Sequence, residues 1–88
     1  MDAPAGSDSE MLLAVLDEFI ILIRSEGDTF WAGWLEKDRN LIAAGDQEGH
    51  RHLKQAFGGM GSLNDRYYHG IHAHMLSEIY NLSGKLNP

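Results

Sequence analysis

Asp38 is the most unusual candidate for chemistry in this chain of 88 residues. Helical spacing places it at the centre of an apolar stripe that includes Trp31 and Trp34. A carboxylate in such a position must be paired or hydrogen-bonded, because burying it without a partner costs several kcal/mol. We expect it to accept N–H bonds from the turn at residues 58–62. The functional alternative is a general acid or base with a raised pKa.

That turn belongs to the stretch FGGMGSLNDR, residues 57–66. Glycines before a helix could bind an anion, but the lysine of a nucleotide-binding loop is missing and no strand precedes the turn. We expect a structural corner with five defined positions, followed by helix-capping residues. Gly58 ends a helix, Gly59 and Gly61 take positive φ, Met60 enters the core and Ser62 begins the next helix.

The five histidines are a second source of chemistry. His69 and His72 have i,i+3 spacing and could share a metal ion with His50 or Asp38. No metal motif of high specificity is present. By helical phase we expect His50 and His72 to be partly buried, and His52 and His74 to face solvent.

Ser62, Asp65 and His69 could form a nucleophilic arrangement, but the sequence contains no recognisable catalytic motif. Helix capping explains Ser62 and Asp65 better. We therefore expect that the protein is not an enzyme and has no cofactor.

The elements that must position these residues are helices. Apolar periodicity predicts helices over residues 10–26, 30–44 and 47–57, and a last helix that follows Ser62 and runs to about residue 82. Their expected caps are Ser7, Asp28 or Thr29, and Asp46, and their expected stops are Gly27, Gly45, Gly58 and Gly84. The segment RYYHG, residues 66–70, could instead be extended, in which case the last helix starts near residue 71.

The predicted fold is all-α, a small four-helix domain with the glycine-rich turn between the third and fourth helices. Residues 1–7 are expected to form a flexible tail, and residues 8–88 a single helical domain. The first of these helices has an apolar arc of about 200°, wider than one neighbour needs, so we expect it to be central.

Charge narrows the classes of partner. The formal net charge is −6, and residues 1–48 hold 11 acidic and three basic side chains, whereas residues 49–88 hold two acidic and four basic ones. A chain with so few basic residues cannot form the basic face that nucleic-acid binding needs. A basic protein partner is more plausible electrostatically. The expected docking residues lie on the first two predicted helices: Asp17, Glu18, Ile21 and Glu36.

The chain has no cysteine, and its apolar runs are shorter than the roughly 18 residues that span a bilayer. Its first residues are acidic where a signal peptide would be basic. We therefore expect a cytoplasmic protein that does not bind a membrane.

The residues that follow Phe30 resemble a family of short bacterial proteins of uncharacterised function. The resemblance rests on Trp31, Trp34 and Asp38, and on AFGGMGSLND, in which Gly58, Gly59, Met60, Gly61, Ser62, Asn64 and Asp65 form the core. It covers about residues 30–66. At the level of class, small acidic bacterial proteins of this type include immunity and antitoxin-like proteins.

Three functional readings remain open. The first is a protein-binding domain, for example an immunity- or antitoxin-like protein that neutralises a cationic partner. The second is a small-ligand or metal site, or less readily a catalytic one, around Asp38, His50, His69 and the Gly58–Ser62 turn. The third is a homo-oligomeric structural module that associates through the apolar arc of the first helix.

Overall fold

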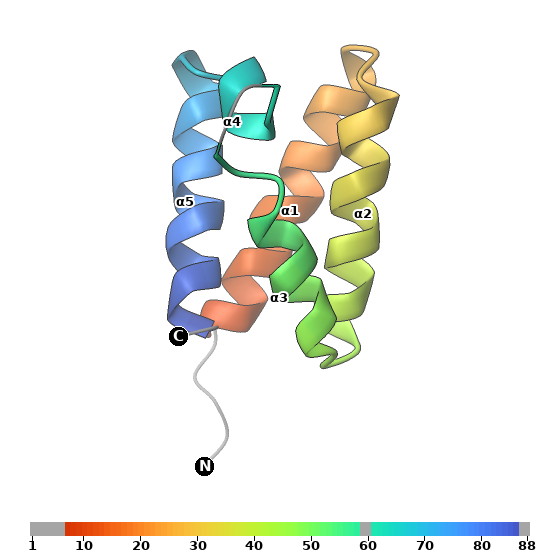
Figure 1. The fold of residues 1–88 in the computed structure, drawn as a ribbon, viewed down its shortest axis with the longest axis vertical. Helices are drawn as coiled ribbons and strands as arrows, with labels where there is room; N and C mark the ends of the chain where they lie inside the picture. The colour runs from red at the N-terminus through yellow and green to blue at the C-terminus, as the bar shows by residue number, and fades with distance from the viewer. Residues whose placement is uncertain (1–6, 59–60, 87–88) are drawn as a thin grey trace.

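The chain folds into helices only, within the part described by the computed structural model, residues 7–58 and 61–86. The helices are α1 (Asp8–Ser25), α2 (Thr29–Ala43), α3 (Gln47–Lys54), α4 (Leu63–Arg66) and α5 (Gly70–Leu86). Four of them form the bundle, and the short α4 lies beside the start of α5 (Figure 1). The predicted all-α class is confirmed, and the four-helix layout holds in outline.

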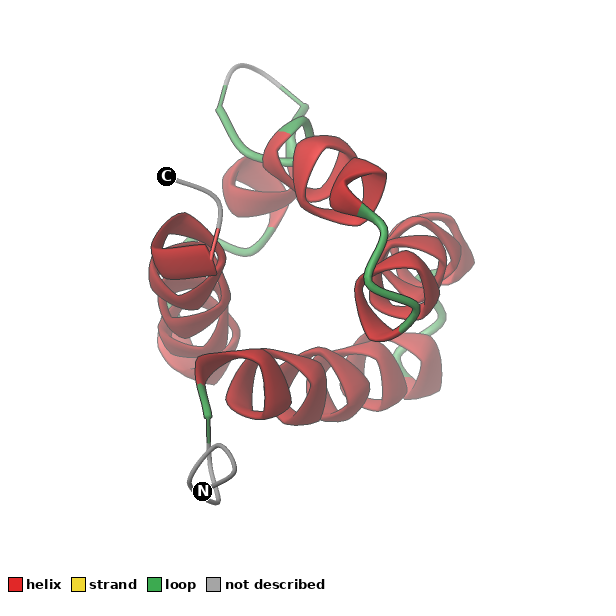
Figure 2. Ribbon diagram, turned by 90° about the horizontal axis from the view of Figure 1, so that it is seen from below, coloured by secondary structure: helices red, strands yellow, loops and turns green. Residues whose placement is uncertain are grey.

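The bundle is closed unevenly. Viewed along its long axis, the helices surround a central space that the core side chains fill (Figure 2). α1 packs against both α2 and α5, and α2 packs against α3, whereas α3 and α5 contact each other much less. The seam between α3 and α5 is therefore the weakest of the four sides.

Three helices begin at the caps expected from the sequence. The Ser7 hydroxyl accepts an N–H bond from Glu10, and carboxylates of Asp28 and Asp46 cap α2 and α3. A side chain that satisfies one of the free N–H groups at a helix start fixes where that helix begins. No helix in the described part of the chain is long and apolar enough to cross a membrane.

The wide apolar arc of α1 is used inside the protein. Five of its side chains are buried in the core: Leu12, Leu16, Phe19, Ile20 and Ile23. Leu13 and Val15 are partly buried against the same core, and Met11 and Ile21 remain exposed. The arc that suggested self-association is thus largely covered by α2 and α5.

The last predicted helix is divided in two. α4 ends at Arg66, and α5 begins at Gly70, whose φ is +73°, close to the alternative start near residue 71. The break has a tertiary cause, because the Tyr67 side chain reaches the corner between α1 and α2. α5 then continues through Gly84 to Leu86, so Gly84 does not stop the helix as expected.

α3 is shorter than predicted and ends at Lys54. The N–H groups of Gln55, Ala56 and Phe57 bond to carbonyls three residues earlier, which is the tighter pattern common at helix ends. Gly58 and Gly61 have φ values of +90° and +78°, which side chains with a Cβ rarely adopt. The expectations for Gly59 and Met60 lie outside the described residues.

Candidate functional site

Asp38 lies at the interface between α2 and α3 and is fully buried. Its carboxylate is paired with the Nδ1 atom of His52 on α3. The N–H groups of Gly58 and Gly61 bond to Asn64 and Asp65 rather than to Asp38, so the expected bonds are corrected at these two positions. The same expectation for Gly59 and Met60 lies outside the described residues. The residue that meets Asp38 is also one that helical phase had assigned to solvent.

His52 turns inward because α3 approaches α2 closely. Gly49 lies one turn earlier on α3, and a Cβ placed there would lie 2.7 Å from the Cγ1 atom of Ile42 and 2.8 Å from its backbone nitrogen. The missing side chain permits an approach that brings His52 onto Trp34, with ring centroids 4.2 Å apart and planes 20° apart. The stack and the carboxylate together fix the orientation of the imidazole.

Burial dominates the ionisation of this pair. Desolvation raises the pKa of Asp38 to about 6, and His52, Lys37 and Trp34 each offset part of that increase. The second carboxylate oxygen of Asp38 and the indole N–H of Trp34 are buried, and neither makes a well-formed hydrogen bond among the described residues. Asp38 can therefore gain or lose a proton near pH 6.

The other residues of the predicted ligand site are placed differently. His50 is buried, and burial lowers its pKa, whereas His69 is exposed beside Tyr68. Within the described ranges, no three histidine or carboxylate side chains are grouped so that they could hold a metal ion. Asp38, His50 and His69, all of which the structure describes, therefore do not form a shared metal centre.

The glycine-rich turn is held by two polar residues that directly follow it, Asn64 and Asp65. Asn64 Oδ1 accepts bonds from the Gly58 N–H at 3.0 Å and the Ser62 hydroxyl at 2.7 Å. Asp65 Oδ2 accepts a bond from the Gly61 N–H at 3.1 Å. Ser62 occupies the N-cap position of α4 without a capping bond from its side chain. The Asn-Asp pair that follows the glycines thus shapes the turn.

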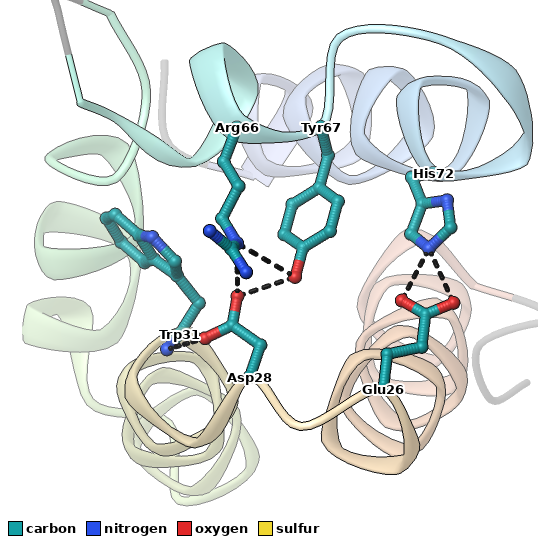
Figure 3. Close-up of polar contacts among 6 residues, drawn as sticks. All are labelled: Glu26, Asp28, Trp31, Arg66, Tyr67 and His72. Atoms are coloured by element: carbon teal, nitrogen blue, oxygen red, sulfur yellow. Dashed lines mark hydrogen bonds and ion pairs between the residues drawn. The ribbon is translucent and has the colours of Figure 1, made fainter.

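A cluster of polar side chains ties the corner between α1 and α2 to α4 and α5 (Figure 3). The buried carboxylate of Asp28 accepts a bond from the Trp31 N–H at 3.0 Å through Oδ1. Its Oδ2 atom accepts the Tyr67 hydroxyl at 2.5 Å and forms an ion pair with Arg66 Nε at 2.9 Å. One residue therefore caps α2 and anchors α4.

A second polar contact lies next to this anchor. His72 Nε2 lies 2.8 Å from Glu26 Oε1, and the imidazole stacks on the Tyr67 ring with centroids 5.0 Å apart (Figure 3). Phe19 packs edge-on against both rings from the core. Burial, together with the bond to Asp28, raises the pKa of the Tyr67 hydroxyl, so it acts as a donor rather than an anion.

Sequence reasoning missed this cluster. Asp28 was expected only as a cap, and the segment that contains Arg66 and Tyr67 was expected to be helical or extended. The bond from Tyr67 to Asp28 joins residues 39 positions apart. No local pattern in the sequence could have indicated such a contact.

A groove of about 680 Å³ lies along the weak seam between α3 and α5. Four aromatic side chains line it: Phe57, Tyr67, Tyr68 and Tyr80. Leu76 and Ala73 of α5 add apolar surface, and Tyr68 and Tyr80 are 74% and 55% exposed. Protein pockets of about this size that are mostly apolar are typical of binding sites.

The polar lining of the groove links it to the glycine-rich turn. Gly58 and Asn64 contribute to its wall, together with Lys54 from the end of α3 and Ser77 from α5. The Asn64 bond to Gly58 and the Tyr67 bond to Asp28 therefore both fix parts of the groove wall.

The predicted docking face on α1 and α2 is partly neutralised. Asp17 is ion-paired with Arg39 at 2.9 Å, and Glu36 with Arg24 at 3.1 Å. Both pairs join α1 to α2. Glu18 and Ile21 are exposed, and Ile21 is 68% exposed. Two of the four expected docking residues thus serve the contact between these helices.

A family model described as a domain of unknown function, DUF6966, matches residues 24–77, more than half of the chain. The chain belongs to this family. The matched range contains the polar corner, the Asp38–His52 pair, the glycine-rich turn and much of the groove. Neither the curated proteins nor the solved structures include a match. The resemblance to an uncharacterised family therefore agrees with the match, while its residue motif stays a prediction.

Proposed function

We propose that this member of the DUF6966 family is a protein-binding domain that receives an apolar segment of its partner in the groove between α3 and α5. The observation that carries the proposal is the exposed aromatic lining of the one weakly packed side of the bundle. Tyrosines contribute heavily to binding energy at protein interfaces, because each buries a large area with few rotatable bonds.

A helix is the kind of segment that such a seam accommodates. Each neighbouring pair in the order α5, α1, α2, α3 is well packed, whereas α3 and α5 contact each other much less and the groove lies along that side. An amphipathic helix laid in the groove would contact its aromatic walls through apolar residues spaced at i, i+3, i+4 and i+7. Such a partner would complete the packing that the chain leaves open.

The test compares partner capture from the native host by three purified variants and the wild type. Tyr80→Ser alters the groove, Phe30→Ser alters a similarly exposed aromatic residue outside it, and Glu18→Lys alters the acidic face of α1. We expect Tyr80→Ser to weaken the affinity for the captured partner at least tenfold, as loss of an interface hot spot does. Phe30→Ser should leave it unchanged.

The proposal would be overturned if wild type and Tyr80→Ser bound the partner with equal affinity and unfolded at the same temperature. If Glu18→Lys alone lowered the affinity for the partner, the binding site would lie on the acidic face of α1 instead. That result would support the prediction of a basic partner, as for an immunity- or antitoxin-like protein. Affinity that falls steeply with added salt would point the same way.

Self-association is the remaining reading, and it stays a prediction. Met11 and Ile21 are the large apolar side chains of α1 that are left exposed within the described residues. Elution at the size of a monomer at micromolar concentration would argue against it.

A further inference from the structure

We infer that the partner helix lies antiparallel to α5 in the groove, and that Asn64 donates a hydrogen bond to a backbone carbonyl of its last turn. This inference rests on the proposed function and specifies the direction in which the partner occupies the groove. Two observations carry it: the hydrogen bonds of the Asn64 side chain, and the position of α4 at one end of the seam.

The bonds of the Asn64 side chain fix which way its amide faces. The Oδ1 atom lies 3.0 Å from the Gly58 nitrogen and 2.7 Å from the Ser62 hydroxyl oxygen. A backbone N–H can only donate, so the atom opposite Gly58 is the amide oxygen rather than the amide nitrogen. A carbonyl oxygen has two lone pairs, and these two donors use both. The part of the amide left for a partner is therefore the NH2 group, which only donates.

The hydroxyl groups of the lining adapt to a partner, whereas the Asn64 amide does not. Tyr68, Tyr80 and Ser77 each carry a hydroxyl that can rotate to donate or to accept. The Tyr67 hydroxyl is already donated within the protein. Asn64 is exposed in the groove wall, and a partner group placed against its NH2 group must be an acceptor, because a donor there would leave both groups without a bond.

The short helix α4 lies across one end of the seam. Figures 1 and 2 place it between α3 and α5, at the end of the bundle where α5 begins. Asn64 is the second residue of α4 and part of the groove wall. A helix laid along the groove therefore meets α4 with one of its two ends, and that end lies against Asn64.

The two ends of a helix offer opposite groups. The first N–H groups and the last C=O groups have no partner within the helix. Only the C-terminal end therefore offers backbone acceptors to the NH2 group of Asn64. Since α5 begins at this end of the bundle, a helix whose last turn lies here runs antiparallel to α5. This direction also places the partial negative charge of its C-terminus near the partial positive charge at the start of α5.

A synthetic helix tests the direction: acetyl-Ala-Leu-Gln-Lys-Leu-Phe-Gln-Glu-Leu-Ala-Ala-amide, with a lactam bridge between its Lys and Glu side chains. The bridge joins positions i and i+4, which holds the peptide helical and removes both charges. Its Leu and Phe residues have the i, i+3, i+4 and i+7 spacing that a groove accommodates. A nitroxide is attached through a cysteine added at one end of the peptide or at the other.

The direction is then read from the NMR signals of the full chain. The amides of Gly70 and Gly84 lie about 21 Å apart along α5, and Gly70 is the one next to α4. We expect the C-terminal nitroxide to broaden the Gly70 signal more than the Gly84 signal, and the N-terminal nitroxide to do the reverse. This measurement uses the wild type, so it does not depend on how a variant folds.

Asn64→Asp tests the donor itself. The substitution removes the NH2 group but keeps an oxygen for the Gly58 N–H, whose slow exchange would show that the turn is retained. The affinity for the peptide should fall about three- to tenfold, as the loss of one hydrogen bond predicts. Asn81→Asp adds the same charge at an exposed position of α5 outside the groove and should bind the peptide as the wild type does.

Three results would overturn the inference: stronger broadening of Gly70 by the N-terminal nitroxide, equal broadening of both signals by each nitroxide, or unchanged affinity of Asn64→Asp with slow Gly58 exchange. In each case, weaker binding of the peptide by Tyr80→Ser would leave the proposed function standing. If the peptide does not bind, the partner captured from the host decides. Unchanged affinity of Asn64→Asp for that partner would overturn the inference, and unchanged affinity of Tyr80→Ser would reject the proposed function itself.

Discussion

The Nδ1 atom of His52 is hydrogen-bonded to the buried carboxylate of Asp38, across the contact between α3 and α2. This pair joins the helix that carries part of the groove wall to the centre of the bundle. The charge state of Asp38 and the position of α3 therefore depend on each other, since a buried charge is tolerated only with its partner in place.

The stability of the protein should depend on pH through Asp38. Burial raises the pKa of this carboxyl from 3.8 to about 6, so between these values the folded protein binds more protons there than the unfolded chain. The contribution of Asp38 to the free energy of unfolding therefore decreases as the pH rises through 6. Urea unfolding at pH 5 and pH 7 should show this change in the wild type and lose it in Asp38→Asn.

The pH dependence of the wild type must be compared with that of Asp38→Asn, because His50 changes the free energy of unfolding with pH in the opposite direction. Burial lowers the pKa of His50, so its contribution to stability decreases as the pH falls below 6.5. His74→Gln, at an exposed histidine, provides a control that should follow the wild type. A difference between wild type and Asp38→Asn that does not vary between pH 5 and 7 would contradict the prediction.

The hydroxyl of Tyr67 should contribute measurably to stability. Tyr67→Phe keeps the ring against Phe19 and His72 but removes the 2.5 Å bond to the buried Asp28. We expect a loss of about 1–2 kcal/mol, because a hydrogen bond to a buried charge is among the stronger ones and Arg66 still neutralises that charge. Calorimetric unfolding should show a Tm decrease of about 4–8 °C per kcal/mol.

Tyr68→Phe is the matched control, since this neighbouring tyrosine is 74% exposed. Its Tm should stay close to that of the wild type. Equal Tm values for Tyr67→Phe and Tyr68→Phe would mean that the anchor of α4 does not depend on the hydroxyl.

Gly49→Ala should destabilise the protein although alanine favours helices. A Cβ at this position would lie 2.8 Å from the backbone nitrogen of Ile42 and 2.9 Å from the Cβ atom of Leu41, so α3 would have to move away from α2. The cost of such overpacking is about 1–3 kcal/mol, against a helix propensity gain of about 1 kcal/mol. The stack of His52 on Trp34 should weaken too, with a change in tryptophan fluorescence.

Gly33→Ala, on the exposed side of α2, is the control that measures the gain in helix propensity without a change in packing. A Cβ there would meet nothing within 4 Å, so the substitution should raise stability by up to about 1 kcal/mol. If Gly49→Ala raised stability to the same degree, the close approach of α3 to α2 would be refuted.

Asn64 should be required for the form of the glycine-rich turn. Asn64→Ala removes the acceptor for the exposed Gly58 N–H and for the partly buried Ser62 hydroxyl, which should cost about 1 kcal/mol. Hydrogen exchange of the Gly58 amide should become faster. Asn64→Asp, which retains an acceptor oxygen, should restore slow exchange, and faster exchange in this variant as well would argue against the assigned bond.

Much of the secondary structure could be predicted from the sequence, because its causes are local. The apolar spacing within each helix and the capping side chains of Ser7, Asp28 and Asp46 act over a few residues, and the structure contains the helices that they predict. At the last helix the alternative start near residue 71 agrees with the observed start at Gly70, whereas the continuous helix from Ser62 is wrong, because a side chain there bonds to a residue far away in the sequence. Tyr67 leaves the helical path to reach Asp28.

The sequence by itself determined that the chain is helical, that Asp38 needs a partner and that a glycine-rich corner precedes Ser62. Only the tertiary structure decided that the partner of Asp38 is His52, that Asn64 and Asp65 hold the corner, and that a groove lined by tyrosines lies along the weak seam between α3 and α5. The physical reason is the same in each case. Helical phase fixes which residues share a face, but the distance between two packed helices depends on side chains from both, and at Gly49 on a side chain that is missing.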